Sequence, residues 1–381
     1  MVKSLKAQQQ TSRIIRYTVL IFVLIISTVT GLLHQFGKSL MTAPVDAFCP
    51  FGGLESFYSL AVSGTYLKRT AWSSFILLFA TIILAFLFRR TFCGNICPLG
   101  TLQELFEKLR GKFMKKRFVI PVKADKYLRY LKYLVLVFIL ALTFKLGDMF
   151  IRPYDPWAAY NHLSSEDLLV EFPIGLAILI ITFAGSFLYD RFFCKYLCPM
   201  GAFLGIAGKI GIFRIKRVEE TCIHCNLCTK VCPVNIQVHE ADTVITAECI
   251  NCNECVNKCP VENTLVIAAP GGRKKINASL FTVITLSVFF GIILMTTITG
   301  DFSWKMASLK ISESLEKFNT DDIKGKNTFN EIITSTGLPR ELFMDKFGIT
   351  EEQLALPVKE SGIETSLVRD FILELQEKAK H

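Results

Sequence analysis

Long apolar runs interrupt the otherwise polar chain at five places. They cover roughly residues 14 to 33, 71 to 88, 130 to 147, 172 to 189 and 277 to 299. Because an α-helix needs about 20 residues to cross the hydrocarbon of a bilayer, each run predicts a transmembrane helix. The third run is the weakest, and a buried or re-entrant helix is its alternative. If this helix crosses, Lys132 and Lys145 at its two ends reach the opposite interfaces.

Basic residues are distributed unevenly between the loops that flank these runs. Residues 89 to 129 contain eleven Lys or Arg and three acids, whereas residues 148 to 171 contain one Arg and five acids. Since cytoplasmic flanks are enriched in Lys and Arg, we expect the first loop inside and the second outside, with the tail from about residue 300 also outside. The net charge of +10 follows from these flanks and does not indicate nucleic-acid binding. The first run has no small-residue cleavage signal after it, which predicts an uncleaved first span.

The second and fourth apolar runs end in the same motif. Residues 90 to 100 read R-T-F-C-G-N-I-C-P-L-G, and residues 191 to 201 read R-F-F-C-K-Y-L-C-P-M-G, at an offset of 101 residues. Each copy follows a span, a loop and a second span. The membrane part is therefore expected to consist of two hairpins in the same orientation, with both motifs on the cytoplasmic side.

Each copy of this motif carries one C-x3-C pair, and cysteines four apart share one face of a helix. The pairs are Cys93 with Cys97 and Cys194 with Cys198. Repeated hairpins place both pairs at the same depth, so four thiolates that meet there predict a further metal or redox site, either an iron-sulfur cluster or a tetrahedral metal. The alternative is that each Cys-Pro ends a helix and packs as a small buried hydrophobe.

Eight of the thirteen cysteines form two C-x2-C-x2-C-x3-C-P runs, which lie between the fourth and fifth apolar runs. In bacterial two-cluster ferredoxins the fourth cysteine of each such run ligates the other cluster. Zinc needs only four tetrahedral ligands, so two complete runs over-specify it. His224 lies inside the first run, where a surface or packing role is expected. The predicted [4Fe-4S] ligand sets are Cys222, Cys225, Cys228 and Cys259 for one cluster, and Cys249, Cys252, Cys255 and Cys232 for the other.

Residues of the outer loops raise the question of two further cofactors, a haem and a quinone. A haem between His34 and His162 is disfavoured, since no buried pair of helical histidines lies at matching depth. Tyr154, Asp155, Trp157 and His162 form a polar and aromatic group at which a quinone headgroup could hydrogen-bond. Membrane anchoring is the alternative role of such interfacial aromatic residues.

Two hairpins that each end in C-x3-C-P, followed by a two-cluster ferredoxin segment, resemble the membrane polyferredoxins associated with periplasmic nitrate reductase and with nitrous-oxide reductase. The resemblance covers about residues 10 to 275. It implies an inner-membrane electron conduit that draws on quinol or a cytoplasmic donor and supports a reductase or its assembly. A related group, the copper-reducing accessory proteins of oxidase assembly, shares the fifth span and the outside domain. In such a role the lone outer Cys49 would be a redox thiol or soft-metal ligand, and a buried inert thiol is the alternative.

The expected fold is a membrane all-α helical bundle with an inserted two-cluster ferredoxin-like α+β segment and a small helical extracytoplasmic domain. The expected domains are residues 1–210, 211–272, 273–300 and 301–381. The expected function is electron transfer between a quinol or cytoplasmic donor and a reductase partner, as a component and not a stand-alone enzyme. The alternative is a maturation or regulatory factor that reduces a metal ion or cofactor. Membrane lipid, redox proteins and a quinone are the expected partners.

Overall fold

A computed structural model gives the fold of the chain as two compact units, residues Met1–Trp304 and Lys305–His381. The structure describes residues 2–36, 49–63, 72–114, 118, 120–146, 150–165, 168–269, 275–302, 315 and 318–379. Residues 71 and 147, at the limits of two predicted spans, and most of residues 303–317 in the predicted C-terminal domain lie outside this description. The two units are described separately below.

Among the described residues of the first unit, three helices are long and apolar enough to cross a membrane. They contain the apolar stretches Lys6–Leu33, Lys123–Lys145 and Ala278–Ile298. The first stretch lies in α1 (Val2–Phe36), the second covers α6 (Val122–Leu128) and α7 (Leu131–Leu146), and the third is α15 (Ala278–Ile298). Many of their large apolar side chains are exposed, as lipid contact requires. The protein is therefore an integral membrane protein.

The other two apolar runs form shorter helices, α3 (Trp72–Phe88) and α10 (Pro173–Leu188). At 1.5 Å per residue, the 17 residues of α3 extend about 26 Å, which is less than the hydrocarbon thickness of about 30 Å. The chain leaves the helical conformation at Arg89, with φ 62°, after α3 and at the extended Tyr189 after α10, and Arg191, with φ 50°, precedes α11. Both helices therefore end immediately before the repeated cysteine motif.

The elements that follow α3 and α10 correspond to each other. The first copy continues with α4 (Thr91–Asn95) and α5 (Pro98–Phe113), and the second with α11 (Phe192–Tyr196) and α12 (Pro199–Ala207). The proline of each Cys-Pro pair is the first residue of the later helix, where its missing N–H costs no hydrogen bond. Each motif thus forms one short helix, a break and the start of a second helix.

A small antiparallel sheet closes the ferredoxin segment, which lies between α12 and α15. Strand β1 (Arg214–Arg217) precedes all eight cysteines of the runs and pairs with β2 (Leu265–Ala268), which follows them. Strand β3 (Lys275–Ile276) completes the order β1-β2-β3. Two short helices, α13 (Leu227–Lys230) and α14 (Glu254–Lys258), follow the first cysteines of the two runs. The sheet therefore ties the two ends of the cysteine-rich chain together.

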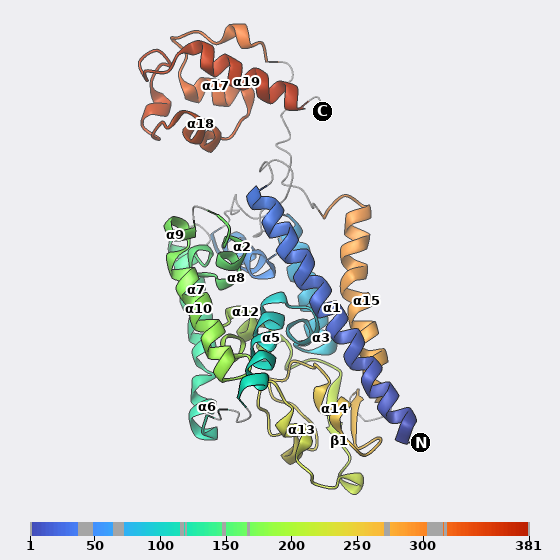
Figure 1. Cartoon of the computed structure of the whole chain (residues 1–381). Helices are drawn as coiled ribbons and strands as arrows, with labels where there is room; N and C mark the ends of the chain where they lie inside the picture. Colours follow the sequence, from blue (N-terminus) through green and yellow to red (C-terminus); the bar gives the residue numbers. More distant parts are fainter. Residues whose placement is uncertain are drawn as a thin grey trace. The chain divides into compact units, whose positions relative to one another are not determined.

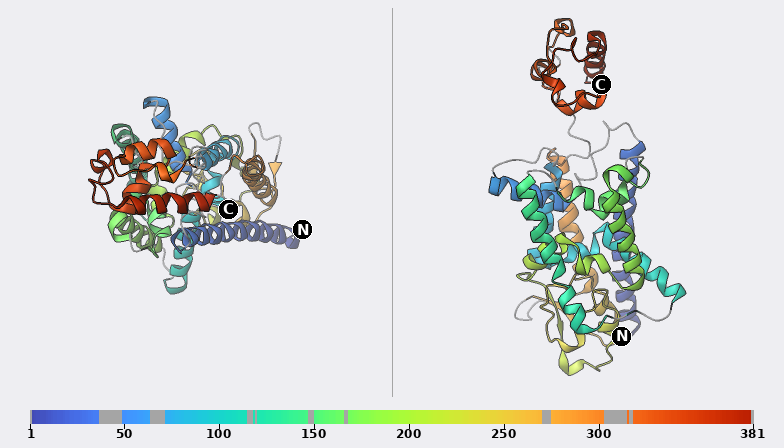
Figure 2. Two further views of the ribbon diagram at one scale, coloured as in Figure 1. Left: turned by 90° about the horizontal axis from the view of Figure 1, so that it is seen from above. Right: turned by 90° about the vertical axis from the view of Figure 1, so that its left-hand side faces the viewer.

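Helix α1 runs along the whole first unit and packs against α15, α5 and α14. Figures 1 and 2 show that its N-terminal end lies beside the ferredoxin segment, while its other end lies near α8 (Pro156–Asn161). The remaining helices on that side are α2 (Pro50–Ser63) and α9 (Leu168–Glu171). One helix thus contacts both the apolar bundle and the cysteine-rich segment.

The second unit is a small helical assembly with its own apolar core. Its helices are α17 (Phe329–Thr336), α18 (Arg340–Phe347) and α19 (Thr365–Ala379). Phe329, Phe343 and Val368 are fully buried in this core. Thr328 and Glu331 form a reciprocal capping box at the start of α17, and Gly337, with φ 69°, ends that helix. The described part of this unit therefore consists of short helices around one apolar core.

Candidate functional site: cysteine-lined cavities and their junction with the membrane part

Two small cavities in the ferredoxin segment are each lined by four cysteines. The outer cavity is lined by Cys222, Cys225, Cys228 and Cys259, and the inner cavity by Cys232, Cys249, Cys252 and Cys255. In each set the fourth cysteine of one run joins the first three of the other run. The structure therefore brings together the same two groups of thiols that the spacing predicts as ligand sets.

The two cavities differ in their exposure to solvent. All four cysteines of the inner cavity are buried, whereas Cys225 of the outer cavity is exposed and its three companions are half-buried. Burial is the largest of the effects that raise the pKa of the Cys252 thiol to about 12. Because iron binds the thiolate, such a thiol would lose its proton only together with metal binding. The inner cavity is thus a dry site and the outer cavity a solvent-facing one.

Left-handed residues shape both cysteine loops in the same way. His224 and Asn226 have φ of 52° and 59°, and the equivalent Asn251 and Asn253 have φ of 46° and 61°. Asparagine adopts this conformation more readily than most residues, and it turns the chain sharply between consecutive ligands. The repeated asparagine is a sequence signal for this turn that the cysteine spacing alone does not contain. His224 itself is exposed and lies 3.4 Å from Glu219, in keeping with a surface position.

The two C-x3-C-P motifs meet through crossed arginines. Arg191 of the second copy donates from Nη1 to the carbonyl oxygen of Cys93 in the first copy at 2.6 Å. A Cβ atom at Gly100 would lie 2.9 Å from this Nη1, and a Cβ atom at Gly201 would lie 2.8 Å from Nη2 of Arg90. Each arginine therefore reaches the glycine of the other copy, where any side chain would collide with it.

The first motif also packs directly against the inner cavity. A Cβ atom at Gly94 would lie 2.3 Å from the carbonyl oxygen of Ile250, so only glycine allows this approach. Asn95 donates from Nδ2 to the carbonyl oxygen of Asn251 at 3.2 Å. Ile250 and Asn251 also line the inner cavity. The membrane part therefore touches the loop that carries Cys249 and Cys252.

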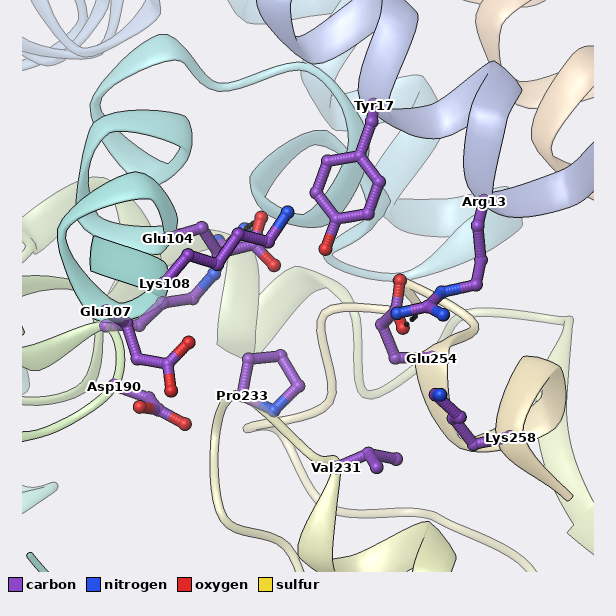
Figure 3. A pocket seen from close by; sticks show the side chains of 11 residues that line it. Arg13, Tyr17, Glu104, Glu107, Lys108, Asp190, Val231, Pro233, Glu254 and Lys258 are labelled. Carbon is purple, nitrogen blue, oxygen red and sulfur yellow. Dashed lines mark hydrogen bonds and ion pairs between the residues drawn. The ribbon is translucent and has the colours of Figure 1, made fainter. Parts of the chain in front are cut away.

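A buried ion-pair network fastens the ferredoxin segment to α1 and α5. Arg16 pairs with Glu104 at 2.8 Å and with Glu254 at 3.1 Å, and Arg191 pairs with Glu104 at 3.1 Å. Burial alone would raise the pKa of Glu104, but the guanidinium groups of Arg16 and Arg191 outweigh it and lower this pKa to about 2. Figure 3 shows the charged pocket at this junction, where Glu104, Arg13 and Glu254 line a cavity together with Pro233. The Glu104 carboxylate therefore stays ionised at neutral pH.

A second network lies on the other side of the inner cavity. Lys132 of α7 is fully buried and pairs with Glu248 at 2.5 Å, and Arg90 lies 3.5 Å from the same carboxylate. The expectation that Lys132 extends to the lipid interface is therefore replaced by a specific ion pair with the residue that precedes Cys249. Such a partner, 116 residues away, could not be found from the local sequence.

A largely apolar cavity extends from Pro50 and Trp157 to the first cysteine motif. Its walls come from α1, α15 and the segment around α4, and include Ile26, Ile293, Phe92 and Ile96. Phe92 and Ile96 directly flank Cys93 and Cys97 in sequence. The cavity is therefore open along the apolar helices and ends beside the first pair of C-x3-C thiols.

Of the four residues predicted to bind a quinone headgroup, only Trp157 lines this cavity. Tyr154 stacks on Phe150, and Asp155 caps α8 by accepting from the backbone N–H of Trp157. His162 is buried against Phe172. The four residues therefore do not form one group, because each is used locally.

The structure describes the side chains of two of the three remaining predicted positions, Cys49 and His162. Cys49 is half-buried next to the main apolar core, at the start of α2. The side chain of His34, weighed as a haem ligand, lies outside the described residues. His162 is 9% exposed and its Nδ1 lies 2.8 Å from the carbonyl oxygen of Ala158.

Comparison with known proteins identifies the segments that carry the cysteines. The family described as "4Fe-4S binding domain" matches residues 70–117 and again residues 171–217, and the "4Fe-4S dicluster domain" matches residues 214–260. "Putative electron transport protein YccM" of Escherichia coli is 32% identical over 65% of this chain and 72% of its own length. The chain belongs to the membrane polyferredoxin family. The resemblance to the accessory polyferredoxins of nitrate and nitrous-oxide reductases is thereby confirmed.

Other relatives of this polyferredoxin match about half of the chain. An uncharacterized protein of Methanocaldococcus jannaschii is 35% identical over 50% of this chain and 75% of its own length. "Ferredoxin-type protein NapH" of Escherichia coli is 26% identical over 53% of this chain and 66% of its own length. No solved structure matches the polyferredoxin. The matched families and relatives together identify the chain as an iron-sulfur electron-transfer protein of the membrane.

The residues of the polyferredoxin fit iron-sulfur clusters better than single metal ions. In the described part of the chain, no three His, Cys, Asp or Glu side chains converge closely enough to hold one metal ion. A single zinc ion requires sulfur atoms about 2.3 Å from one point, whereas a cubane carries its irons at the corners of a larger cage. Each cavity has four cysteines in its wall, which is the number of thiolates that one cubane takes.

Proposed function

We propose that the protein carries electrons between a quinol or cytoplasmic donor and a reductase partner, through two [4Fe-4S] clusters held by the inner and outer cysteine sets. The observation that carries this proposal is the difference in depth between the two cavities. The buried one adjoins the membrane part, and the other has an exposed thiol, Cys225. When bound, each cluster supplies a one-electron carrier. The chain's own contribution is to hold one carrier next to the membrane part and the other at the surface.

The proposed topology has five spans in the inner membrane. In this topology the ferredoxin segment, residues 211–272, is cytoplasmic, and residues 301–381 form an extracytoplasmic domain after the fifth span at residues 273–300. The basic residues between 89 and 129 support this orientation. An alkaline phosphatase fusion after Ala269 should be inactive and one at the C-terminus active. The opposite pattern would contradict the topology.

A quinol is the donor that the apolar cavity supports. This cavity opens between α1 and α15 and ends at Phe92 and Ile96, so a membrane-soluble ring would come close to Cys93 and Cys97. Quinol oxidation releases two electrons and two protons. The two electrons match the two one-electron carriers, and the protons leave to solvent. Most buried lining of such a site is expected to be apolar, as it is here.

The quinol proposal can be tested by filling the cavity. Ile26 lines it and Ile25, its neighbour on α1, does not. Anaerobic protein with its clusters oxidised is mixed with a quinol analogue, and bleaching of the cluster absorbance is followed. Ile26→Trp should slow bleaching by about tenfold, and the control Ile25→Trp should leave it unchanged, while dithionite still reduces both variants. Equal rates in all three proteins would contradict a quinol site in this cavity.

The same preparation tests the whole function. The unaltered protein should contain at least about eight iron atoms per chain, because two cubanes hold four irons each. Protein that lacks iron, or that binds it without being reducible, would contradict electron transfer. Reduction of Cu(II) by the reduced protein, with no response to quinol, would instead support the role of a factor that reduces a metal for enzyme assembly.

A further inference from the structure

We propose that Cys93, Cys97, Cys194 and Cys198 together hold one further [4Fe-4S] cluster, shared between the two repeats, and that Arg90 and Arg191 donate hydrogen bonds to it from Nε. This proposal deepens the proposed function, since it adds a carrier between the membrane part and the inner cysteine cavity. Its test measures iron bound at these four thiols and is separate from the test of the ferredoxin segment.

The repeats require a shared site because neither is complete alone. The two matches to the 4Fe-4S binding family, residues 70–117 and 171–217, each contain only two cysteines. A cubane held by protein thiolates takes four. Cysteine ligands from both copies supply that number only when the copies face each other, which is the arrangement that the crossed arginines hold in place.

The four thiols lie within electrostatic reach of one another. Cys97 lies close enough to Cys194 and Cys93 for their charges to act on it. Cys198 lies within the same reach of Cys194, Cys93 and Cys97. Two of the thiols already accept hydrogen bonds, from Gln103 Nε2 to Cys194 at 3.2 Å and from the backbone N–H of Gly201 to Cys198 at 3.3 Å. The group therefore has donors directed at its sulfur atoms.

Two buried hydrogen-bond donors beside the four thiols have no acceptor within the described ranges of the chain. Arg90 and Arg191 are 2% and 0% exposed. Their terminal nitrogens are engaged, by the carbonyl oxygen of Ala247 in one case and by Cys93 and Glu104 in the other. Their Nε atoms, however, have no hydrogen-bond partner among the residues that the structure describes. Buried polar groups are nearly always paired, so two equivalent unpaired donors beside four thiols indicate an acceptor that occupies the space between them.

The charge of these donors suits an iron-sulfur cluster. A cubane with four thiolate ligands carries net negative charge, and hydrogen bonds to its sulfur atoms raise its reduction potential. Two guanidinium groups, one from each repeat, would stabilise that charge in a dry setting. Simple packing of four small cysteine side chains would not by itself require a buried cation from each repeat beside them.

The proposed cluster would lie next to the inner cavity, so it could pass electrons to the cluster held there. Gly94, between Cys93 and Cys97, contacts the backbone at Ile250, next to Cys249. Lys195, next to Cys194, donates to Asn235 at 2.6 Å, on the loop that follows Cys232. Both motifs therefore touch chain segments that carry inner-cavity thiols, and the further cluster would be adjacent to the buried ferredoxin cluster.

Iron content and low-temperature EPR of anaerobically prepared full-length protein test the proposal. The unaltered protein should hold about twelve iron atoms and show three reducible centres. Cys93→Ser combined with Cys194→Ser should lower the iron content by about four and remove one EPR signal, while the two ferredoxin signals persist. Cys49→Ser is the matched control, because Cys49 lies in the membrane part outside the quartet, and should retain about twelve iron atoms.

Arginine variants test the hydrogen bonds without removing a ligand. Arg191→Lys keeps the positive charge but lacks Nε–H, and should retain the iron while lowering the potential of the quartet signal alone. About eight iron atoms in the unaltered protein, with no change on altering the quartet, would overturn the proposal and leave the ferredoxin function intact. A quartet-dependent loss of only one or two irons would overturn the cubane. Iron well below eight in every protein would contradict the proposed function and the further cluster together.

Discussion

The inner and outer cysteine cavities are built from the same motif and placed in opposite surroundings. Both use three thiols of one run and the fourth of the other, and both loops turn through left-handed residues at matching positions. The outer cavity has an exposed thiol at Cys225, whereas the inner one is covered by Gly94 and fastened by Arg16 through Glu254. Local sequence thus determines the loop, and the surrounding chain determines whether its thiols face solvent or the membrane part.

Replacing one cysteine ligand in each cavity should give the largest measurable difference between the two sites. Cys252→Ser disrupts the inner site, on which the docking of the ferredoxin segment depends, and Cys225→Ser disrupts the solvent-facing one. Since metal binding supplies folding free energy, we expect Cys252→Ser to lower the yield of folded, detergent-soluble protein by about tenfold or more. Cys225→Ser should lose about four iron atoms at nearly normal yield. Equal yields for the two variants would contradict a structural difference between the cavities.

Breaking the ion-pair network should have the next largest effect. Arg16→Met removes the buried cation shared by Glu104 and Glu254, leaving Glu104 with Arg191 and Glu254 with Arg13, and breaking such a buried pair typically costs about 3–5 kcal/mol. The matched control is Arg13→Met, whose side chain is 37% exposed and pairs with the same Glu254, and which should cost only about 0–1 kcal/mol. The thermal midpoint for loss of cluster absorbance in detergent measures both.

If Arg13→Met destabilised the protein as much as Arg16→Met, the docking would depend on the surface pair instead of the buried network. A midpoint unchanged in both variants would mean that the ferredoxin segment keeps its clusters without this anchor. Either result would weaken the contrast between the two cavities.

A membrane-impermeant oxidant should destroy the EPR signals of the two clusters at different rates. The cluster at Cys225 contacts solvent, so its EPR signal should be lost about tenfold faster than the inner signal, which corresponds to a barrier difference of about 1.4 kcal/mol. In Arg16→Met the two rates should converge, because the inner loop loses its cover. Loss of the inner signal first would reverse the assignment of signals to cavities.

The smallest predicted effect concerns pH. Glu104 has a pKa of about 2 in the folded protein, lowered from an ordinary value of 4.5. Its contribution to stability is therefore fully present above pH 4.5 and is lost as the pH falls toward 2. Between pH 7 and pH 4 the stability gap between the unaltered protein and Glu104→Gln should narrow by about 1 kcal/mol. A gap that widens on acidification would show that Glu104 is not held ionised by Arg16 and Arg191.

Local patterns in the sequence were sufficient for much of this structure. The apolar runs mark α1, α7 and α15, and the spacing of the cysteines separates the eight thiols into the two groups that line the cavities. The offset between the two C-x3-C-P copies is also reproduced in the helices that follow α3 and α10. Each of these features repeats within a few residues or at a fixed interval.

The junction could not be predicted in the same way. Arg16 meets Glu254 across 238 residues, and Lys132 meets Glu248 across 116, and each of these charges appears from the sequence alone to be an ordinary membrane-flanking residue. The apolar cavity is likewise formed by helices far apart in the chain, and a motif contributes to its walls only at the end near Phe92 and Ile96. Among the described residues, three of the five expected spans are long enough to cross a membrane, whereas the second and fourth runs form the shorter helices α3 and α10, which end just before the cysteine motifs.

Arg90 and Arg191 each contact the glycine of the other motif copy, and this contact bears on the ancestry of the fold. Contacts in which each copy offers the other the same residue are those of a two-fold symmetric interface between identical subunits. A half-length chain with one C-x3-C-P motif would present the same arginine and glycine, and would complete the four-thiol group only by pairing with a second copy of itself. Gene duplication and fusion would then have converted a homodimer into a single polypeptide. Once the halves were joined, each could diverge on its own, as Asn95 and Lys195 illustrate by contacting different loops of the ferredoxin segment.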